Sequence, residues 1–468
     1  MTDVSEAVVD NDDWSPLEVT PPPKKEGDDE DKPERWSPLY IAKKYVSDIK
    51  QCVAYMPGHG WYYKHSPNKS SDSTWHPDEN DTKIKGSVTS YCTANHQSTD
   101  LKNRNEILEQ MRVFNTVPLS RWDCDDWVVA DAAGRIWPLD PNRDRKKNNR
   151  ITLRLGVKVA TSGVPPKLFI SCLRRWLPEG DDEVFNYFSL YLGSLLTGST
   201  ADEILMAMTG YAGTGKSSLG RVLEEVGGDY ATVVKRQGLM GGSNSVHSEW
   251  MMKLMKRRVA LVSELPNGKW NSSLLNSLVS GETQTANLMR QNSVSFTPTA
   301  KFIVLCNNLP GMDSDGYDGL KRRLVIVPFD RKVSPEEKDE NLKYKLRAEY
   351  PQIAAWLIER AREYAYNGLP ELPESLAKEQ AEYMADENLY AKWANLNVVE
   401  SSDGFISSQD LLDLYNHDMD EHDKSPRALI RHLVETRRCK KDRQKVDGKL
   451  VRGVRGIEID VSSSGGDF

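Results

Sequence analysis

The stretch Gly210-Tyr-Ala-Gly213-Thr-Gly215-Lys216-Ser217 decides the fold, because it matches the phosphate-binding loop pattern GxxxxGK[ST] in full. It follows an apolar, strand-like run over residues 204–208 and opens a helix-like segment over residues 217–226. Glycines allow successive backbone N–H groups to turn towards phosphate oxygens, and the helix N-terminus adds a favourable dipole. The predicted nucleotide-binding residues are Gly210, Ala212, Gly213, Thr214, Gly215, Lys216, Ser217 and Ser218.

Lysine and the hydroxyl residue after it have separate roles in such a loop. Lys216 is expected to reach the β- and γ-phosphates, and Ser217 is expected to bind Mg²⁺. The sequence therefore predicts ATP and Mg²⁺ as the cofactors of this site.

Hydrolysis also needs a carboxylate near the γ-phosphate, on a neighbouring strand. The run over residues 258–263 reads as an apolar strand, and Glu264 follows it. Glu264 is predicted to orient or deprotonate the attacking water and to hold Mg²⁺ through water. Many such enzymes have two adjacent acids here, whereas this chain has Ser263 before Glu264, which leaves the division between metal binding and base open.

Two further polar elements follow along the chain. Asn307 comes directly after the strand-like run over residues 302–306, where an amide beside the phosphate site can sense the γ-phosphate. Arg322 and Arg323 precede another strand-like run over residues 324–327, and a guanidinium there could act as an arginine finger on a neighbour's nucleotide. Either arginine could be the finger, and Arg-Arg before a strand is also common at a solvated edge.

Residues 200–330 alternate short apolar runs with helix-like segments, which is typical of an α/β domain with a mainly parallel sheet. The runs are continuous rather than alternating, as expected for strands that are buried on both faces. Residues 335–366 favour helices, and residues 41–55 and 105–114 also read as helical. Residues 38–199, which include the last two of these helical segments, also contain short, aromatic-rich strands, so an α+β fold is expected there.

These four elements, in this order and spacing, resemble those of superfamily 3 helicases of the phage, plasmid and poxvirus type, a branch of the AAA+ ATPases. Residues 122–139 and 185–198 look like the helicase-associated region that precedes the loop in this family. Residues 368–376 and 383–386 resemble the family's exit into a winged-helix-like C-terminal domain. About residues 38–460 are covered, and the ATPase motifs are the specific part.

The resemblance implies a domain plan for the whole chain. Its parts are an acidic tail at 1–37, a helicase-associated domain at 38–199, an ATPase core at 200–335, a helical lid and connector at 336–385, a basic winged-helix-like domain at 386–460 and a disordered tail at 461–468. Roughly 200 residues precede the loop, with no metal-binding acid pair or zinc pattern among them. A helicase without a primase domain is therefore expected, with a separate primase or polymerase as a partner.

The family also implies a homo-hexameric ring that moves 3′ to 5′ along single-stranded DNA and opens forked DNA. A hairpin that projects into the pore of such a ring would correspond to residues 284–296 here. Arg290 near its tip is our candidate for gripping phosphates, and Lys301 at the base of the next strand is a second candidate.

A second candidate DNA surface lies near the C-terminus. Residues 424–455 hold twelve basic and three acidic side chains, in a helix over 425–434 followed by a hairpin that ends at 459. This density favours binding to DNA phosphates, although RNA or an acidic partner would also fit. The residues chosen here are Arg437, Arg438, Lys440 and Lys441.

Composition limits the remaining possibilities. The formal charge of −7 hides an uneven distribution, because residues 1–36 alone hold twelve acidic and four basic side chains and are expected to be disordered. The apolar runs are far shorter than the ~20 residues that span a bilayer, so no membrane association is expected. Six scattered cysteines without a CxxC pair favour a reducing compartment, the cytoplasm of a host cell if the source is a virus or phage.

Three functions remain open on the sequence alone. The leading expectation is an ATP-dependent DNA helicase that replicates a phage, virus or mobile element. An origin-binding replication initiator with a regulatory ATPase is the second. The third is an AAA+ remodelling or defence ATPase that acts on protein, whose hydrolysis would be indifferent to DNA.

Overall fold

The computed structural model divides the chain into two compact units. One comprises Met1–Pro138 and Asn142–Leu155, and the other comprises Leu139–Pro141 and Gly156–Phe468. The residues that the structure describes are 36–48, 53–64, 72–144, 146, 150–234, 239, 247–263, 270–287, 293–310, 317–333, 339–387, 389–419, 427–437, 439–446 and 449–460.

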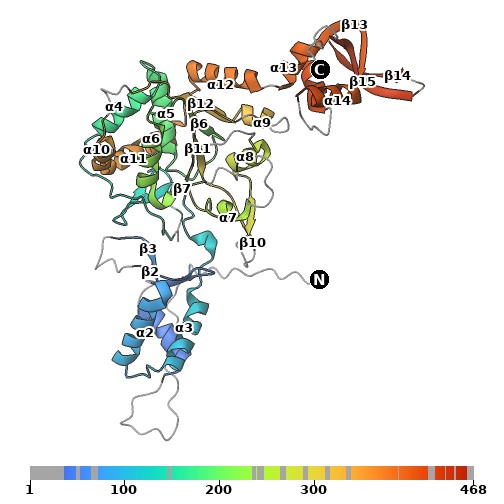
Figure 1. Cartoon of the computed structure of the whole chain (residues 1–468). Coiled ribbons are helices and arrows are strands. Elements are labelled where there is room, and N and C mark those ends of the chain that lie inside the picture. The colour runs from blue at the N-terminus through green and yellow to red at the C-terminus, as the bar shows by residue number, and fades with distance from the viewer. Residues whose placement is uncertain are drawn as a thin grey trace. The chain divides into compact units, whose positions relative to one another are not determined.

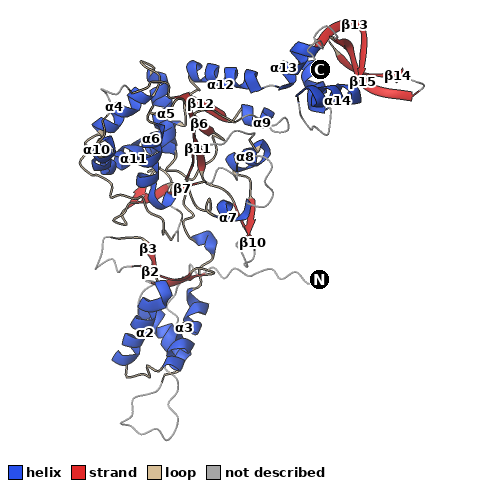
Figure 2. Cartoon of the chain, viewed as in Figure 1, coloured by secondary structure: helices blue, strands red, loops and turns tan. Residues whose placement is uncertain are grey.

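A five-stranded parallel sheet forms the centre of the second unit (Figures 1 and 2). Its strands lie in the order β12-β6-β11-β8-β7, so the strand before the glycine-rich loop, β6, has β11 on one side and β12 on the other. The strands are β6 (Leu205–Thr209), β7 (Ala231–Val233), β8 (Val259–Ser263), β11 (Lys301–Leu305) and β12 (Leu324–Pro328). The expected α/β class with a parallel sheet is confirmed.

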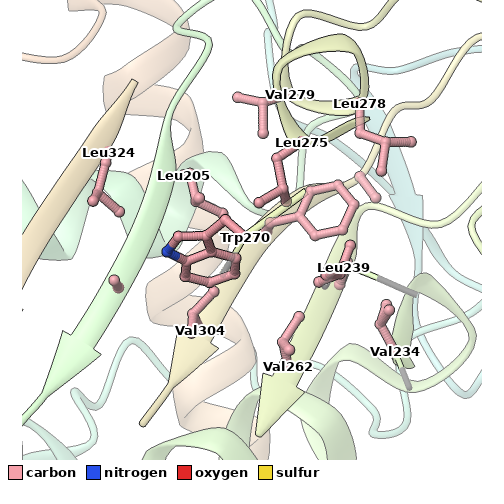
Figure 3. Packing of buried hydrophobic residues seen from close by; sticks show 14 of the residues in the cluster. Leu205, Val234, Leu239, Val262, Trp270, Leu275, Leu278, Val279, Val304 and Leu324 are labelled. Atoms are coloured by element: carbon pink, nitrogen blue, oxygen red, sulfur yellow. The ribbon is translucent and has the colours of Figure 1, made fainter. Parts of the chain in front are cut away.

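One face of this sheet packs on short helices through an apolar core. Trp270, fully buried, lies among side chains of the strands and of the helices, with Leu205 and Val304 on either side of its indole (Figure 3). Alternate residues of β6, β8, β11 and β12 enter this core, and the residues between them face the opposite side of the sheet, which explains why these four strands are apolar throughout. The helices that contribute are α7 (His247–Met252), α8 (Ser272–Val279) and α9 (Tyr317–Lys321).

Longer helices cover the opposite face. Helix α6 (Lys216–Gly227) leaves the glycine-rich loop and packs Gly220 against Leu305 of β11. Helices α5 (Asp182–Ser194) and α11 (Tyr350–Asn367) cross so closely at Gly193 that an added Cβ would lie 2.4 Å from the Cβ of Arg360. A larger residue at 193 would therefore separate the two helices.

This packing moves the expected domain boundary. Residues 38–199 were all expected in an N-terminal domain, but the structure assigns residues from 156 onwards to the second unit. Helix α4 (Lys167–Trp176) belongs to that unit as well. The carboxylate of Glu349, also in this unit, binds the first turn of α4. Glu349 accepts hydrogen bonds from the backbone N–H groups of Leu168 (3.0 Å) and Phe169 (2.9 Å).

Helices continue the second unit as expected for residues 336–385. They are α10 (Leu342–Ala348), α11 and α12 (Glu374–Glu387). Helix α12 packs on β12, with Met384 buried in the core of the sheet.

The C-terminal residues form a module with an apolar core of its own, centred on Trp393 and Leu433. Its order is helix, strand, two helices and two strands, and its sheet is antiparallel with the order β13-β15-β14. The elements are α13 (Leu389–Asn397), β13 (Val398–Ser407), α14 (Ser408–Met419), α15 (Arg427–Thr436), β14 (Lys440–Val446) and β15 (Lys449–Ile459). The expected helix followed by a hairpin is present.

The first unit combines helices with small antiparallel sheets, as expected for an α+β fold. Its helices are α1 (Pro38–Asp48), α2 (Thr82–Ala94) and α3 (Leu101–Asn115), and its strands are β1 (Val53–Met56), β2 (Gly60–Lys64), β3 (Trp75–Pro77), β4 (Val128–Ala130) and β5 (Ile136–Pro138).

A single helix over residues 41–55 was expected in this unit, and that expectation is wrong. The end of that range is strand β1, which pairs with β2 through a turn whose glycines, Gly58 and Gly60, have positive φ. Pairing across this turn outweighs local helix propensity. Trp61 of β2 is 1% exposed and packs in the core of this unit.

The hairpin expected over residues 284–296 is also present in the second unit. Strands β9 (Gln284–Asn287) and β10 (Ser293–Phe296) are antiparallel, and the residues between them lie outside the described part of the chain. Among the described helices, none has the length and apolar content needed to cross a membrane.

Candidate nucleotide site

The glycine-rich loop joins the C-terminal end of β6 to the N-terminus of α6, and three of its residues adopt a backbone conformation that favours glycine. The φ angles of Gly210, Gly213 and Gly215 are 129°, 85° and 105°. Two of these positions are also crowded. An added Cβ would lie 2.2 Å from the carbonyl oxygen of Phe329 at Gly210, and 2.3 Å from Nε1 of Trp176 at Gly215. Glycine is therefore required for both the turn and its close contacts.

The lysine of the loop is folded back over it. Nζ of Lys216 donates to the carbonyl oxygens of Gly210 (2.5 Å) and Tyr211 (2.8 Å), and lies 3.3 Å from Oγ1 of Thr214. Burial lowers the pKa of Lys216, and Cys306 and Asp330 partly oppose this shift. An ammonium that is only 7% exposed and is held by neutral oxygens keeps its charge available for an anion.

A cavity of about 1490 Å³ opens beside the loop. The loop and the first turn of α6 line it from Ala212 to Ser218, which includes every predicted nucleotide-binding residue except Gly210. This volume exceeds the 300–1,000 Å³ of ordinary small-molecule sites, so the cavity has room for a nucleotide.

The ends of two neighbouring strands reach the same cavity. Ser263, the last residue of β8, and Asn307, just after β11, both line it. This convergence follows from the strand order, because β11 lies between β6 and β8 and all three are parallel. The C-terminal ends of parallel strands are where ligands of open α/β sheets bind. Glu264 follows Ser263 directly but lies outside the described residues.

Helix α4 forms a further wall of the cavity that sequence reasoning did not identify. Leu168, Ser171, Cys172, Arg175 and Trp176 line the cavity from this helix. The amphipathic pattern of residues 167–176 indicates a helix, but no local signal connects it to a loop some 40 residues later.

The segment around α10, which contacts α4 and α6, also lines the cavity. Val333, Asp339, Glu340, Leu342 and Lys343 contribute there. The nucleotide site is therefore built from segments before and after the sheet as well as from the sheet itself.

Lys301 does not occupy the position predicted for a DNA contact. It begins β11 at the end of the sheet away from the loop and is only 4% exposed. Nζ donates to the carbonyl oxygen of Ser194 (3.0 Å) and lies 3.7 Å from a carboxylate oxygen of Asp202. Burial lowers the pKa of Lys301 to about 8, and Asp202 opposes the shift. Its role is structural, because the ammonium is inside the protein.

Arg323 is likewise committed to its own chain, which argues against it as a finger for a neighbour. Its guanidinium lies 2.6 Å from a carboxylate oxygen of Glu203 and 2.8 Å from Oγ of Ser280, and the residue is 7% exposed. The adjacent Arg322 is exposed.

The predicted DNA-binding residues divide into three groups. Lys440 and Lys441 are exposed on β14. Arg437 does not fit a DNA contact, because it is partly buried and donates to Oδ1 of Asn395 (2.6 Å) and to the carbonyl oxygen of Ala394 (3.2 Å). Arg290 and Arg438 lie outside the described residues.

The described residues hold no group of three or more His, Cys, Asp or Glu side chains that could bind a metal ion by themselves. Ser217, the predicted magnesium ligand, lines the cavity next to Lys216.

Residues 208–323, which run from the strand before the loop to Arg323, match a family model described as a family of unknown function (DUF5906). A protein of Acanthamoeba polyphaga mimivirus named "Putative helicase L207/L206" is 28% identical over 154 residues. That match covers 32% of this chain and 16% of the viral protein, so the chain spans only a small part of that relative's length.

Solved structures of the apo NrS-1 C terminal region are similar over 90% of this chain and 99–100% of theirs, with sequence identities of 12–13%. Their TM-scores are 0.46 to 0.48.

Two alanine substitutions in the loop should separate backbone strain from crowding. Gly213→Ala introduces a side chain at positive φ into open space, so only strain of about 1–3 kcal/mol is expected. Gly215→Ala adds a collision with the indole of Trp176 and should lower the free energy of unfolding further. Urea unfolding of both variants measures this difference. Equal destabilisation would contradict the close packing of Trp176 on the loop.

Stability around Lys301 should depend on pH. With a folded pKa of about 8, the unfolded chain binds a proton at this residue that the folded chain lacks, between pH 8 and about 10.4. The free energy of unfolding of wild type, relative to Lys301→Met, should therefore rise by about 3 kcal/mol as pH rises through this window. Urea unfolding from pH 7 to 10.5 tests this, with exposed Lys378→Met as the control. Parallel curves for wild type and Lys301→Met would refute a depressed pKa.

Proposed function

We propose that this chain is an ATP-driven motor that acts on DNA, a helicase of the superfamily 3 type. The observation that carries the proposal is one cavity that combines the glycine-rich loop, Lys216 and Ser217 with Asn307 and the end of β8. These are the parts that phosphoryl transfer from a nucleotide requires, assembled at the C-terminal edge of a parallel sheet. The mimivirus protein named as a helicase supports the choice of a helicase over other ATPases.

ATP would bind with its phosphates against the loop. Lys216 would exchange its bonds to the carbonyl oxygens of Gly210 and Tyr211 for the β- and γ-phosphate oxygens. The N-terminus of α6 would add backbone donors and a favourable dipole. Ser217 at the first turn of that helix would hold Mg²⁺, which when bound neutralises charge on the β- and γ-phosphates.

The ends of β8 and β11 would supply the hydrolytic groups. Glu264 would orient or deprotonate the attacking water, and the amide of Asn307 would contact the γ-phosphate or that water. Ser263 stands where a second acid would help to bind the metal, so Glu264 and Ser217 would share that task.

A neighbouring subunit would complete the site. Arg322 is our choice for the arginine finger, because it is exposed whereas Arg323 is bound by Glu203. Both residues precede β12, at the edge of the sheet opposite the loop, so Arg322 is placed to act on another copy's nucleotide rather than its own. A homo-hexameric ring would bring the two edges together.

DNA would be moved by the residues between β9 and β10, where Arg290 is the candidate that grips phosphates. The strands of this hairpin come directly before β11, and the C-terminal end of β11 leads to Asn307 at the cavity. Movement along single-stranded DNA from 3′ to 5′, and a separate primase or polymerase as partner, belong to the same proposal. The C-terminal module, with its order of helix, strand, two helices and two strands, would bind the forked DNA as a winged-helix-like domain.

Removing the loop lysine should abolish the motor. Lys216→Ala is expected to reduce the rate of ATP hydrolysis by at least about 100-fold, because Lys216 is the one buried cation of the described loop that faces the phosphates. Steady-state ATPase and fork-unwinding assays, with and without single-stranded DNA, measure this. Lys343→Ala, at the rim of the same cavity, is the control.

The same assays distinguish the rival functions. Hydrolysis by wild type that DNA does not stimulate, with no unwinding of a fork, would exclude the helicase and favour a remodelling ATPase. Tight, sequence-dependent binding to duplex without unwinding would indicate an origin-binding initiator.

Arg322 should act across a subunit boundary. Arg322→Ala is expected to lose ATPase activity while keeping ATP affinity, and mixing it with Lys216→Ala should restore part of the activity, because some interfaces then combine an intact loop with an intact finger. The exposed neighbour Lys321→Ala should behave as wild type. If the ATPase rate of the mixture is only the sum of the rates of the two separate variants, action in trans by Arg322 is ruled out.

A further inference from the structure

The hairpin of the C-terminal module carries its charges unequally on two faces. Strands β14 and β15 pair in antiparallel register, so side chains directly opposite each other share a face. Lys441, Arg443 and Lys445 of β14 lie on one face, opposite Val454, Arg452 and Leu450 of β15.

The other face is partly neutralised within the chain. Nε of Arg455 donates to a carboxylate oxygen of Asp442 (2.6 Å), and its second nitrogen donates to Oε1 of Gln444 (3.1 Å). The guanidinium of Arg455 also lies over the ring of Phe405. This pairing lowers the pKa of Asp442, which shows that the carboxylate is used to bind Arg455.

The first face has no such compensation. Arg443 and Arg452 are direct cross-strand partners, and both are exposed. Within the described part of the chain, no acidic side chain forms an ion pair with either arginine or with Lys441 or Lys445. Like charges placed directly opposite each other destabilise a strand pair. The facing pair of Arg443 and Arg452 is therefore better explained by binding of a polyanion to this face than by a contribution to the stability of the hairpin.

The shape of this part of the hairpin suits a nucleic-acid duplex. Strand β13 ends at Ser407, opposite Gly453, so from Arg452 towards the turn the hairpin continues as a two-stranded ribbon. A two-stranded ribbon is one of the elements that the major groove of B-DNA admits. Positions 441, 443 and 445 repeat at about 6.8 Å along the strand, so the positive charge runs along the ribbon rather than at one point. Leu450, 62% exposed, adds an apolar contact on the same face.

We propose that this face, formed by Lys441, Arg443, Lys445, Leu450 and Arg452, binds the phosphate backbone of duplex DNA. The proposal rests on the DNA-linked function above and identifies the residues that contact the duplex part of a fork. Of the residues first chosen from the sequence, Lys441 belongs to this face, whereas Lys440 lies on the opposite one and Arg437 is bound to Asn395.

The test measures the binding of the full chain, without nucleotide, to a 20-base-pair duplex of arbitrary sequence. Fluorescence anisotropy gives the affinity at salt concentrations between 50 and 300 mM. Arg443→Ala and Arg452→Ala are each expected to weaken binding several-fold at moderate salt. Each should also reduce the slope of log K against log salt by about 1, and the double variant by about 2. Lys392→Ala, one exposed cation on α13 of the same module, is the matched control and should change affinity less than twofold.

Thermal unfolding of the same variants excludes a structural explanation. Removing one of two facing arginines relieves repulsion, so the unfolding temperature should stay the same or rise. An unchanged affinity and salt slope in the double variant, or an equal loss in Lys392→Ala, would overturn the proposal. The binding assay contains no ATP, so its result is independent of the ATPase assays. If duplex binding depends on this face but DNA does not stimulate ATP hydrolysis, the proposed motor function is refuted and the proposed DNA-binding face is retained.

Discussion

The confinement of the glycine-rich loop between two buried neighbours is the constraint on which the rest of the second unit depends. Gly210 lies against the backbone that follows β12, and Gly215 lies against the indole of Trp176 on α4. The loop can take this path only because both residues lack a Cβ and adopt positive φ. The same contacts fix a helix from before the sheet and a strand end from its far side around one cavity. The nucleotide site is therefore a property of packing as much as of the motif.

Strand order turns this local constraint into a site. The chain places β11 between β6 and β8, so Ser263 and Asn307 reach the cavity although they follow the loop by about 50 and about 90 residues. The sequence was sufficient to predict these strands, because a strand that is buried on both faces must be apolar at consecutive positions. Polar residues that stop such a run mark its end, and the ends of parallel strands meet at one edge. The convergence of these residues could therefore be predicted without coordinates.

The walls of the cavity and the state of the charged residues could not be predicted in this way. Helix α4 meets the loop through tertiary packing that leaves no periodic signal at either segment. Lys301 and Arg323 read as surface cations, since such residues are rarely buried unless paired. Their partners, Asp202 and Glu203, are neighbours in the turn before β6, far from both in sequence. Only the folded chain shows that these two basic residues, at the N-terminal ends of the strands, form ion pairs with two consecutive acidic residues.

What distinguishes a functional cation here is the charge of its partner rather than its position in a basic stretch. At the amino edge of the sheet, carboxylates neutralise Lys301 and Arg323, so those residues have nothing to offer an external anion. At the carboxyl edge, Lys216 is held by carbonyl oxygens that carry no formal charge, and its own charge remains available. The C-terminal hairpin repeats the distinction within two strands, where Asp442 binds Arg455 while Arg443 and Arg452 face each other. A sequence gives the number of cations, but only the register of strands and the location of acids give the number that can bind phosphate.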